Sequence, residues 1–347
     1  MEQALPRGLD RRRFLQSLAT LGLTAGTGTF VSLQPALAGN AYKVTMQLGW
    51  LASNGILGEV AADENGFFAE EGLELEVLPG GPNVDGVASV ASGRANIGQL
   101  SSSPSLMLAR SAGIPVKCIA AGYQKHPFTY FSLKKNPVKE PKDLIGKTVG
   151  TNGTARILLQ ALLAKNGIPE DKVKVVTMGS DMAPLMTGQV DVVTGWNTNT
   201  NALAILGEER VDLSLWDAGV QLYANPYYVT DTDLADHGDK VEAMIRAISR
   251  GWGWAFENRE KAVDLLCTRY PNMDRDIELK TVDLLMAYSF DASTAKTGWG
   301  TMTRENWQAQ IDSYAALGQF QGAAPTVDEV MTLAVLDATA SVRPTFG

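Results

Sequence analysis

The sequence is poor in the residues that build metal and redox centres. Only two of its 347 residues are cysteine and two are histidine, and no CxxC pair occurs. Cys118 lies in an apolar run typical of a buried strand and Cys267 in a helical pattern, so we expect two unpaired buried thiols. A zinc or thiol-exchange site has little to build on. The sequence therefore predicts no cofactor and no metal.

Basic residues are in deficit as well. The chain holds 30 lysines and arginines against 38 aspartates and glutamates, which gives a formal net charge of −8 at pH 7. Nucleic acids and anionic lipids are bound through an excess of positive charge, which this composition does not supply. We therefore expect no nucleic-acid partner. A small anionic ligand is not excluded, because local donors decide its binding.

A long apolar run occurs only at the N-terminus. Arg11–Arg13 precede a Phe-Leu pair, as in the twin-arginine (Tat) export motif, and Ala36–Ala38 has the small residues of a cleavage site. We therefore predict a twin-arginine signal peptide over residues 1–38. A transmembrane anchor is the alternative, which the glycines of the run disfavour, because a bilayer span requires about 20 strongly apolar residues.

Cleavage near Ala38 would release the rest of the chain into the periplasm. No cysteine lies near that site, so no lipid anchor is expected. The remainder is long enough for two domains of ordinary size. We therefore expect a soluble periplasmic protein that begins near Gly39.

The rest of the sequence alternates strand and helix patterns, which predicts an α/β fold with mostly parallel sheets. Leu73–Val77 alternates apolar and acidic residues, as a half-buried strand does. Val90–Gly98 resembles Leu185–Val193: in both, a helix ends at a glycine and a strand follows. Gly93 and Gly188 are therefore candidate left-handed C-caps. This internal echo predicts two lobes of common design.

Two extended aromatic segments are candidates for the crossings between the lobes. Phe128–Leu133 is predicted to leave the first lobe and Pro226–Thr230 to return to it. Lobe 1 would then comprise residues 42–128 plus 229–347, and lobe 2 residues 129–228. The region from about residue 239 onward is helical in pattern, and we expect it to pack on lobe 1.

Four motifs in order resemble a known family, the last of them formed by Asp181–Leu185 and Gly188–Asp191. Asn65–Val77 is similar to the pattern GFF-x-x-EGL-x-V, and Asp143–Gly150 to DL-x-GK-x-VG. Ser92–Gly98 is similar to SG-x-AD-x-G, with Asn96 where the family usually has aspartate. The pattern resembles the periplasmic substrate-binding proteins of ABC importers for sulfonates, taurine, nitrate and thiamine precursors (SsuA/TauA-like). The resemblance covers roughly residues 42–270.

That resemblance implies the type II periplasmic binding protein fold. In it, two mostly parallel sheets flanked by helices are joined by a two-strand hinge, and the ligand binds in the cleft between the lobes. The implied partners are a small-molecule ligand and an ABC permease and ATPase in the inner membrane. The implied protein is a monomer and not an enzyme.

The predicted cleft residues follow strands, because ligands of open α/β sheets bind at the carboxyl ends of strands. Trp50 can stack on a planar ligand and Asn54 can hydrogen-bond it, although Trp50 can equally plug the lobe interface. Ser101 and Ser102 open a helix and offer hydroxyl and backbone donors. Simple capping by Ser103 is the alternative for this segment.

The second lobe offers a matching set. Asn152, Gly153 and Thr154 stand where the resembled family touches its substrate, and no Walker pattern closes this loop. Trp196 and Asn197 follow the last strand of the lobe and offer an aromatic wall with a polar rim.

Tyr223 and Asn225 lie near the return crossing and are predicted either to close the cleft or to pack the hinge. With two tryptophans and few arginines near the cleft, we expect a planar heterocycle such as a pyrimidine thiamine precursor. An aliphatic sulfonate, taurine or nitrate is the alternative cargo.

Two other classes of function remain open. A ligand-sensing protein for a membrane receptor would have the same sequence pattern. An enzyme with a related fold synthesises the thiamine pyrimidine. That enzyme resembles a protein with a cysteine-rich metal motif, and this sequence has no such motif. His126 precedes Pro127 at the first crossing, so we expect it at the hinge or rim and not in catalysis.

Overall fold

The structure, a computed structural model, describes residues 41–81, 84–153, 155–179 and 181–347. The predicted twin-arginine signal peptide over residues 1–38, with its cleavage site near Ala38, lies outside the described residues, as does Thr154. Within the described part, no helix combines the length and apolar character needed to cross a membrane.

The first sheet has five strands in the order β2-β1-β3-β10-β4. β1 is parallel to β2 and β3, whereas β10 is antiparallel to both of its neighbours. The strands are β1 (Tyr42–Leu48), β2 (Leu73–Leu78), β3 (Ile97–Gln99), β4 (Val116–Tyr123) and β10 (Ala224–Thr230). Four of the five strands therefore share one direction.

The second sheet repeats this design, in the order β7-β6-β8-β5-β9. β6 is parallel to β7 and β8, and β5 is antiparallel to both of its neighbours. The strands are β5 (Phe128–Leu133), β6 (Thr148–Thr151), β7 (Lys174–Thr177), β8 (Val192–Trp196) and β9 (Arg210–Ser214). The predicted α/β class with two mostly parallel sheets is confirmed.

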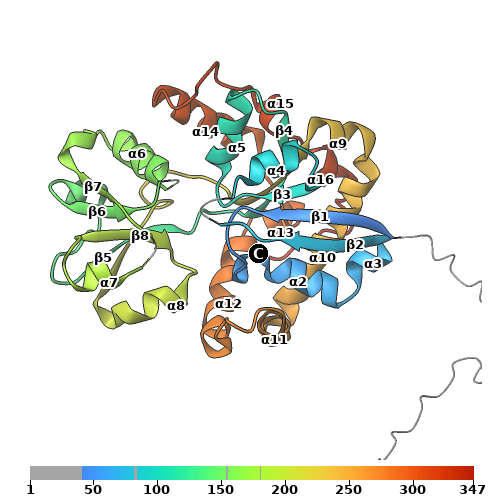
Figure 1. The fold of residues 1–347 in the computed structure, drawn as a ribbon, viewed down its shortest axis with the longest axis horizontal. Helices are drawn as coiled ribbons and strands as arrows, with labels where there is room; N and C mark the ends of the chain where they lie inside the picture. Colours follow the sequence, from blue (N-terminus) through green and yellow to red (C-terminus); the bar gives the residue numbers. More distant parts are fainter. Residues whose placement is uncertain (1–40, 82–83, 154, 180) are drawn as a thin grey trace, which may run out of the picture. The chain divides into compact units, whose positions relative to one another are not determined.

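Helices flank both sheets, and most of the later ones belong to the first (Figure 1). Between the strands of the first sheet lie η1 (Asn54–Ile56), α2 (Leu57–Glu64), α3 (Phe67–Glu70), α4 (Gly86–Ala91) and α5 (Ser103–Ser111). Between those of the second lie η2 (Pro141–Leu144), α6 (Arg156–Lys165), η3 (Glu170–Lys172), α7 (Ala183–Met186), α8 (Thr200–Leu203) and η4 (Ala204–Glu209).

The C-terminal third of the chain is helical, as its pattern predicts. It comprises α9 (Asp231–Asp236), α10 (Gly238–Glu257), α11 (Arg259–Arg269), α12 (Arg275–Ser289), α13 (Thr294–Thr297), α14 (Arg304–Ala316), α15 (Val327–Val330) and α16 (Ala334–Ala338). α10 packs along α2, and Trp252 of α10 is fully buried. The start of α12 is fixed by Asp274, whose side chain accepts from the Ile277 N–H.

The crossings between the sheets lie at residues 124–127 and 215–223. β10 pairs with strands of the first sheet along its length, from Ala224 opposite Tyr123 to Thr230 opposite Val116. The expected boundary between residues 228 and 229 thus falls inside one strand. We propose instead that the second lobe comprises residues 128–223.

The internal echo of the sequence is present in the backbone. Gly93 and Gly188 each follow the last turn of a short helix, α4 and α7, and each has φ near 75°. Only glycine adopts this left-handed conformation at little cost, so the predicted C-caps are confirmed. Cys118 on β4 and Cys267 on α11 are both free; Cys118 is buried and Cys267 only half-buried.

Candidate ligand-binding cleft

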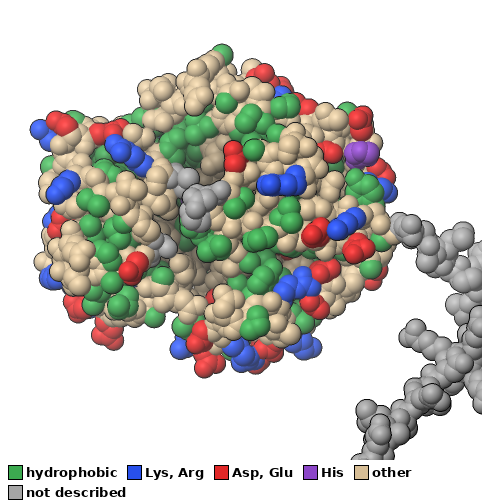
Figure 2. Space-filling model, in the orientation of Figure 1, with side chains coloured by type: hydrophobic (Ala, Val, Ile, Leu, Met, Phe, Trp, Pro, Cys, Tyr) green, Lys and Arg blue, Asp and Glu red, His purple; other side chains and the backbone are tan. Residues whose placement is uncertain are grey.

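A cavity of about 620 Å³ opens between the two sheets. Its walls are the segments that follow β1, β3 and β8, together with the start of α12. Carboxyl ends of parallel strands from both lobes therefore converge on one space, which is the usual ligand position in such folds. On the face of the molecule that Figure 2 shows, most of the lysine, arginine, aspartate and glutamate side chains lie toward the edges.

The structure brings seven of the eleven predicted ligand-binding residues to this cavity. They are Trp50, Asn54, Ser101, Ser102, Asn152, Trp196 and Asn225. Gly153, Asn197 and Tyr223 do not line it. The role of every one of these residues in binding stays a prediction.

The residues that miss the cavity have other contacts. Asn197 donates from Nδ2 to the hydroxyl of Tyr288 on α12 (2.5 Å). The Tyr223 hydroxyl accepts from the Thr303 N–H (3.0 Å), and its ring packs on Trp307. The geometry thus assigns Asn197 to the joint between the lobes and Tyr223 to packing behind the hinge.

Trp196 forms a fixed aromatic wall at the end of β8. Its ring centroid lies 5.5 Å from that of His126 and 6.1 Å from that of Tyr123. His126 lies in the first crossing and lines the cavity, where its Nδ1 accepts from the Phe128 N–H (3.2 Å). Burial lowers the pKa of His126 to about 3, so its imidazole is neutral. Trp196 is therefore held by a neutral, well-packed neighbour.

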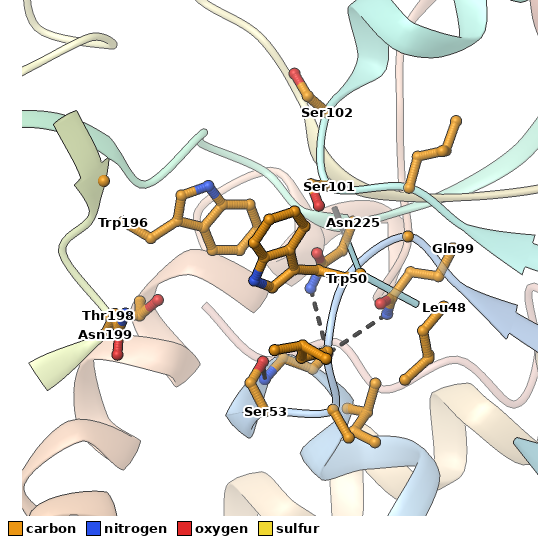
Figure 3. Close-up of a pocket in the computed structure, with 18 of the residues that line it drawn as sticks. Leu48, Trp50, Ser53, Gln99, Ser101, Ser102, Trp196, Thr198, Asn199 and Asn225 are labelled. Atoms are coloured by element: carbon orange, nitrogen blue, oxygen red, sulfur yellow. Dashed lines mark hydrogen bonds between the residues drawn. The ribbon is translucent and has the colours of Figure 1, made fainter. Parts of the chain in front are cut away.

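Trp50 lies on the opposite rim and is far less constrained. Its side chain is 39% exposed and makes no ring contact with any other described aromatic residue. Leu51 and Val84 are exposed beside it. Figure 3 shows both indoles projecting into the same space, one from each lobe.

The floor of the cavity is built on a strained residue. Asn225, at the start of β10, has φ of 49°, and it is the only non-glycine residue of the described chain with positive φ. Its Nδ2 donates to the Gly55 carbonyl (3.2 Å), and Gln99 Nε2 donates to the same oxygen (3.4 Å; Figure 3). Such strain persists where the surroundings enforce it, often at functional sites.

The family described as NMT1/THI5 like matches residues 53–262. The chain belongs to this family. The predicted membership in a family of substrate-binding proteins is thereby confirmed.

Named relatives of this NMT1/THI5-like chain include both binding proteins and enzymes. The formylaminopyrimidine-binding protein of Halalkalibacterium halodurans is 27% identical over 72% of this chain and 78% of that protein. The riboflavin-binding protein RibY of Chloroflexus aurantiacus is 25% identical over 80% and 81%. The 4-amino-5-hydroxymethyl-2-methylpyrimidine phosphate synthase of Schizosaccharomyces pombe is 28% identical over 59% and 63%.

Solved structures share the fold of the NMT1/THI5-like chain. The periplasmic aliphatic sulphonate binding protein SsuA from Escherichia coli superposes with a TM-score of 0.65, covering 85% of this chain and 99% of that one, at 14% identity. The predicted periplasmic binding protein architecture is therefore confirmed, while the low identity leaves the ligand open.

The cavity wall of the NMT1/THI5-like chain carries acidic side chains and no basic ones among its described residues. Among the described residues, the lining includes Asp85 and Glu278 but no lysine and no arginine. Asp85 is partly accounted for, because its Oδ1 caps α4 by accepting from the Ala88 N–H (2.9 Å). The wall therefore offers acceptors and neutral donors, and no cationic group.

The sequence patterns did not predict a buried carboxyl beneath the floor of the cavity. Glu59 of α2 is 1% exposed; its Oε1 accepts from the Tyr227 hydroxyl (2.5 Å) and from Gln99 Nε2 (3.2 Å). Burial raises the pKa of Glu59 to about 7, outweighing the hydrogen bond from Tyr227, which lowers it. One pattern in the sequence could have indicated that Glu59 is buried, namely its position on the apolar face of a helix between Leu57 and Val60.

Glu278 was missed for a different reason. It lies 224 positions after Asn54, yet its Oε2 accepts from Asn54 Nδ2 at 2.8 Å. Local sequence around α12 shows only an exposed-looking acidic helix start, and no motif links the two segments.

Proposed function

We propose that the chain is a substrate-binding protein that captures a planar, neutral or weakly basic heterocycle in this cleft. One observation carries the proposal: indoles from both lobes project into a cavity whose described lining holds no cationic side chain. Aromatic faces on two sides suit a flat ring, since stacking is tolerant of the ring's substituents. The names of the pyrimidine- and riboflavin-binding relatives support this ligand class.

An aliphatic sulfonate, taurine or nitrate suits the cleft less well. Strong anion sites use arginine or lysine, or backbone N–H groups at the start of a helix. Here the two acidic residues of the wall, Asp85 and Glu278, would repel an anion, and no described basic residue offsets them. The shared fold with sulfonate-binding proteins therefore does not extend to their ligand in this proposal.

Synthesis of the thiamine pyrimidine is the second candidate function, favoured by the names of several relatives. His126 is the one histidine on the described wall, and its Nδ1 is occupied by a backbone N–H. We propose a carrier instead. Mass spectrometry discriminates the two: in a cell extract without added pyrimidine, a synthase accumulates new pyrimidine, whereas a carrier accumulates none and returns unchanged any pyrimidine that it is given.

The proposed partners are an ABC permease and ATPase in the inner membrane. The chain would deliver its ligand to them as a monomer in the periplasm. The interlobe contacts favour this role, because closure about a hinge marks the loaded state for a transporter. Asn54 Nδ2 donates to the Thr198 carbonyl (3.1 Å), and the hydroxyls of Thr200 and Thr281 are hydrogen-bonded. A receptor-linked sensor is the alternative, and it predicts that loss of the gene leaves uptake of the heterocycle unchanged.

Substitution of the indoles is the direct test of the cleft. Trp196→Ala and Trp50→Ala should each weaken binding of 4-amino-5-hydroxymethyl-2-methylpyrimidine or riboflavin, measured by calorimetry, by about 5- to 150-fold, the equivalent of about 1–3 kcal/mol of stacking. Trp50→Phe should retain most of the affinity, because a phenyl face remains.

The matched control is Trp254→Ala. Trp254 lies on α10, half-buried against the core and away from the cavity, so affinity should be unchanged. Equal affinity of wild type, Trp50→Ala and Trp196→Ala would remove the cleft from the proposal.

A further inference from the structure

Glu278 is a buried carboxyl on the cavity wall that no cation neutralises. It lies in the first turn of α12, is 5% exposed and lines the cavity. No lysine or arginine of the described chain forms an ion pair with it. Buried carboxyls are normally paired or fully hydrogen-bonded, so this one requires an explanation.

The protein satisfies only one of its two oxygens. Asn54 Nδ2 donates to Oε2 (2.8 Å) and also to the Thr198 carbonyl (3.1 Å). No described side chain donates to Oε1 of Glu278. Burial raises the pKa of Glu278, the hydrogen bond from Asn54 lowers it, and Asp274 raises it further. The hydrogen bond from Asn54 therefore orients the Glu278 carboxyl, while Oε1 receives no hydrogen bond from a described side chain.

The other carboxyls near the cleft do not share this character. Asp85 caps α4 and is exposed, so it needs no further partner. Glu59 lies beneath the floor and does not line the cavity. Glu278 alone among these three is both buried and in contact with the ligand space.

We propose that Glu278 binds an amino N–H of the ligand, so that the cleft selects heterocycles with an exocyclic amino group over ring systems that present a carbonyl there. This inference rests on the proposed function and narrows its ligand class. The free oxygen accepts the donor, and Asn54 acts as a positioning residue that fixes the carboxyl and ties it to the second lobe through Thr198. A ligand N–H would give the carboxyl a second hydrogen-bond donor besides Asn54.

The test compares two probes that differ at one substituent. Wild type should bind 4-amino-5-hydroxymethyl-2-methylpyrimidine about 10-fold or more tightly than its 4-oxo counterpart, because a hydrogen bond to a charged acceptor contributes about 1.5–3 kcal/mol. Glu278→Gln should weaken the amino compound by about 10-fold or more and abolish the preference, since the new amide presents a donor as well as an acceptor.

Asp283→Asn is the matched control. Asp283 lies on the same helix, its side chain is 76% exposed and it pairs with Arg259, so the variant removes one negative charge without touching the cavity. It should keep both affinities. Glu278→Gln removes a buried, unpaired charge, so this variant is not expected to unfold the protein. Glu278→Asp, which withdraws the carboxyl by one methylene, should also lose the preference and provides a second variant.

The outcomes separate the two levels of the proposal. If Glu278→Gln retains the affinity and the preference while Trp196→Ala loses binding, the role of Glu278 is overturned and the heterocycle carrier stands. If wild type binds the 4-oxo compound as tightly as the amino compound, the inference fails in the same way. If wild type binds no heterocycle at all, both are overturned.

Discussion

Gly251→Ala is expected to lower the free energy of unfolding by about 3 kcal/mol or more, measured from urea denaturation. Gly251 lies where α10 crosses α2, and the two backbones are in direct contact. A Cβ at this position would overlap the Gly58 carbonyl oxygen and approach the Ala62 Cβ to 2.6 Å. Backbone atoms cannot move aside as a flexible side chain can, so the helices must separate.

The neighbourhood of this crossing makes separation costly. Trp252, next to Gly251, is fully buried and stacks on Trp299 with a centroid separation of 6.2 Å. α2 also carries Glu59 and leads from the cavity floor, so a shift of this helix would disturb the cleft. Pushing the helices apart would open voids around these rings, which the intrinsic gain of alanine in a helix, about 1 kcal/mol, does not offset.

Gly238→Ala is the matched control for this substitution. Gly238 is the first residue of the same helix, and a Cβ there meets no atom within 4 Å. The control should be neutral or slightly stabilising. If both variants unfold at the same urea concentration, close packing of α10 on α2 is not what stabilises this lobe.

Glu59→Gln should remove a large pH dependence of stability. In the folded chain the pKa of Glu59 is raised to about 7, against 4.5 for the unconstrained group. Between these values the folded state binds more protons than the unfolded state, so stability falls as the pH rises. The contribution is fully present below pH 4.5 and lost above pH 7, a change of about 3 kcal/mol relative to Glu59→Gln.

The comparison with the variant is necessary because His126 has the opposite effect. Its pKa is lowered to about 3, so the neutral form stabilises the fold above pH 6.5 and that stability is lost as the pH falls. The unfolding free energies of wild type and Glu59→Gln are therefore measured from pH 4 to 8, and the difference between them no longer contains the contribution of His126. A constant difference across the range would show that Glu59 keeps an ordinary pKa.

The fold was largely predictable because it depends on local patterns. Apolar alternation identified strands such as β2, and glycines after short helices identified the turns at Gly93 and Gly188, where the backbone requires positive φ. The exact crossing was not predictable. Pro226–Thr230 has the composition of any extended segment, and only its pairing with β3 and β4 places it in the first sheet.

The cleft was predictable where it follows strand ends and not where it depends on tertiary contact. Trp50, Ser101 and Trp196 lie at or just beyond the carboxyl ends of strands that converge, so topology alone places them together. Glu278 comes from a distant helix, and its place depends on how α12 packs. Asn197 is the opposite case, because it follows β8 and yet its amide donates to the Tyr288 hydroxyl and does not line the cavity.

Calorimetric titration of the purified protein with a small panel tests the central claim most directly. The panel contains 4-amino-5-hydroxymethyl-2-methylpyrimidine, riboflavin and an aliphatic sulfonate, with Trp196→Ala run in parallel. The account predicts that a heterocycle binds wild type, that Trp196→Ala weakens this binding and that the sulfonate does not bind. Tight binding of the sulfonate alone would contradict it.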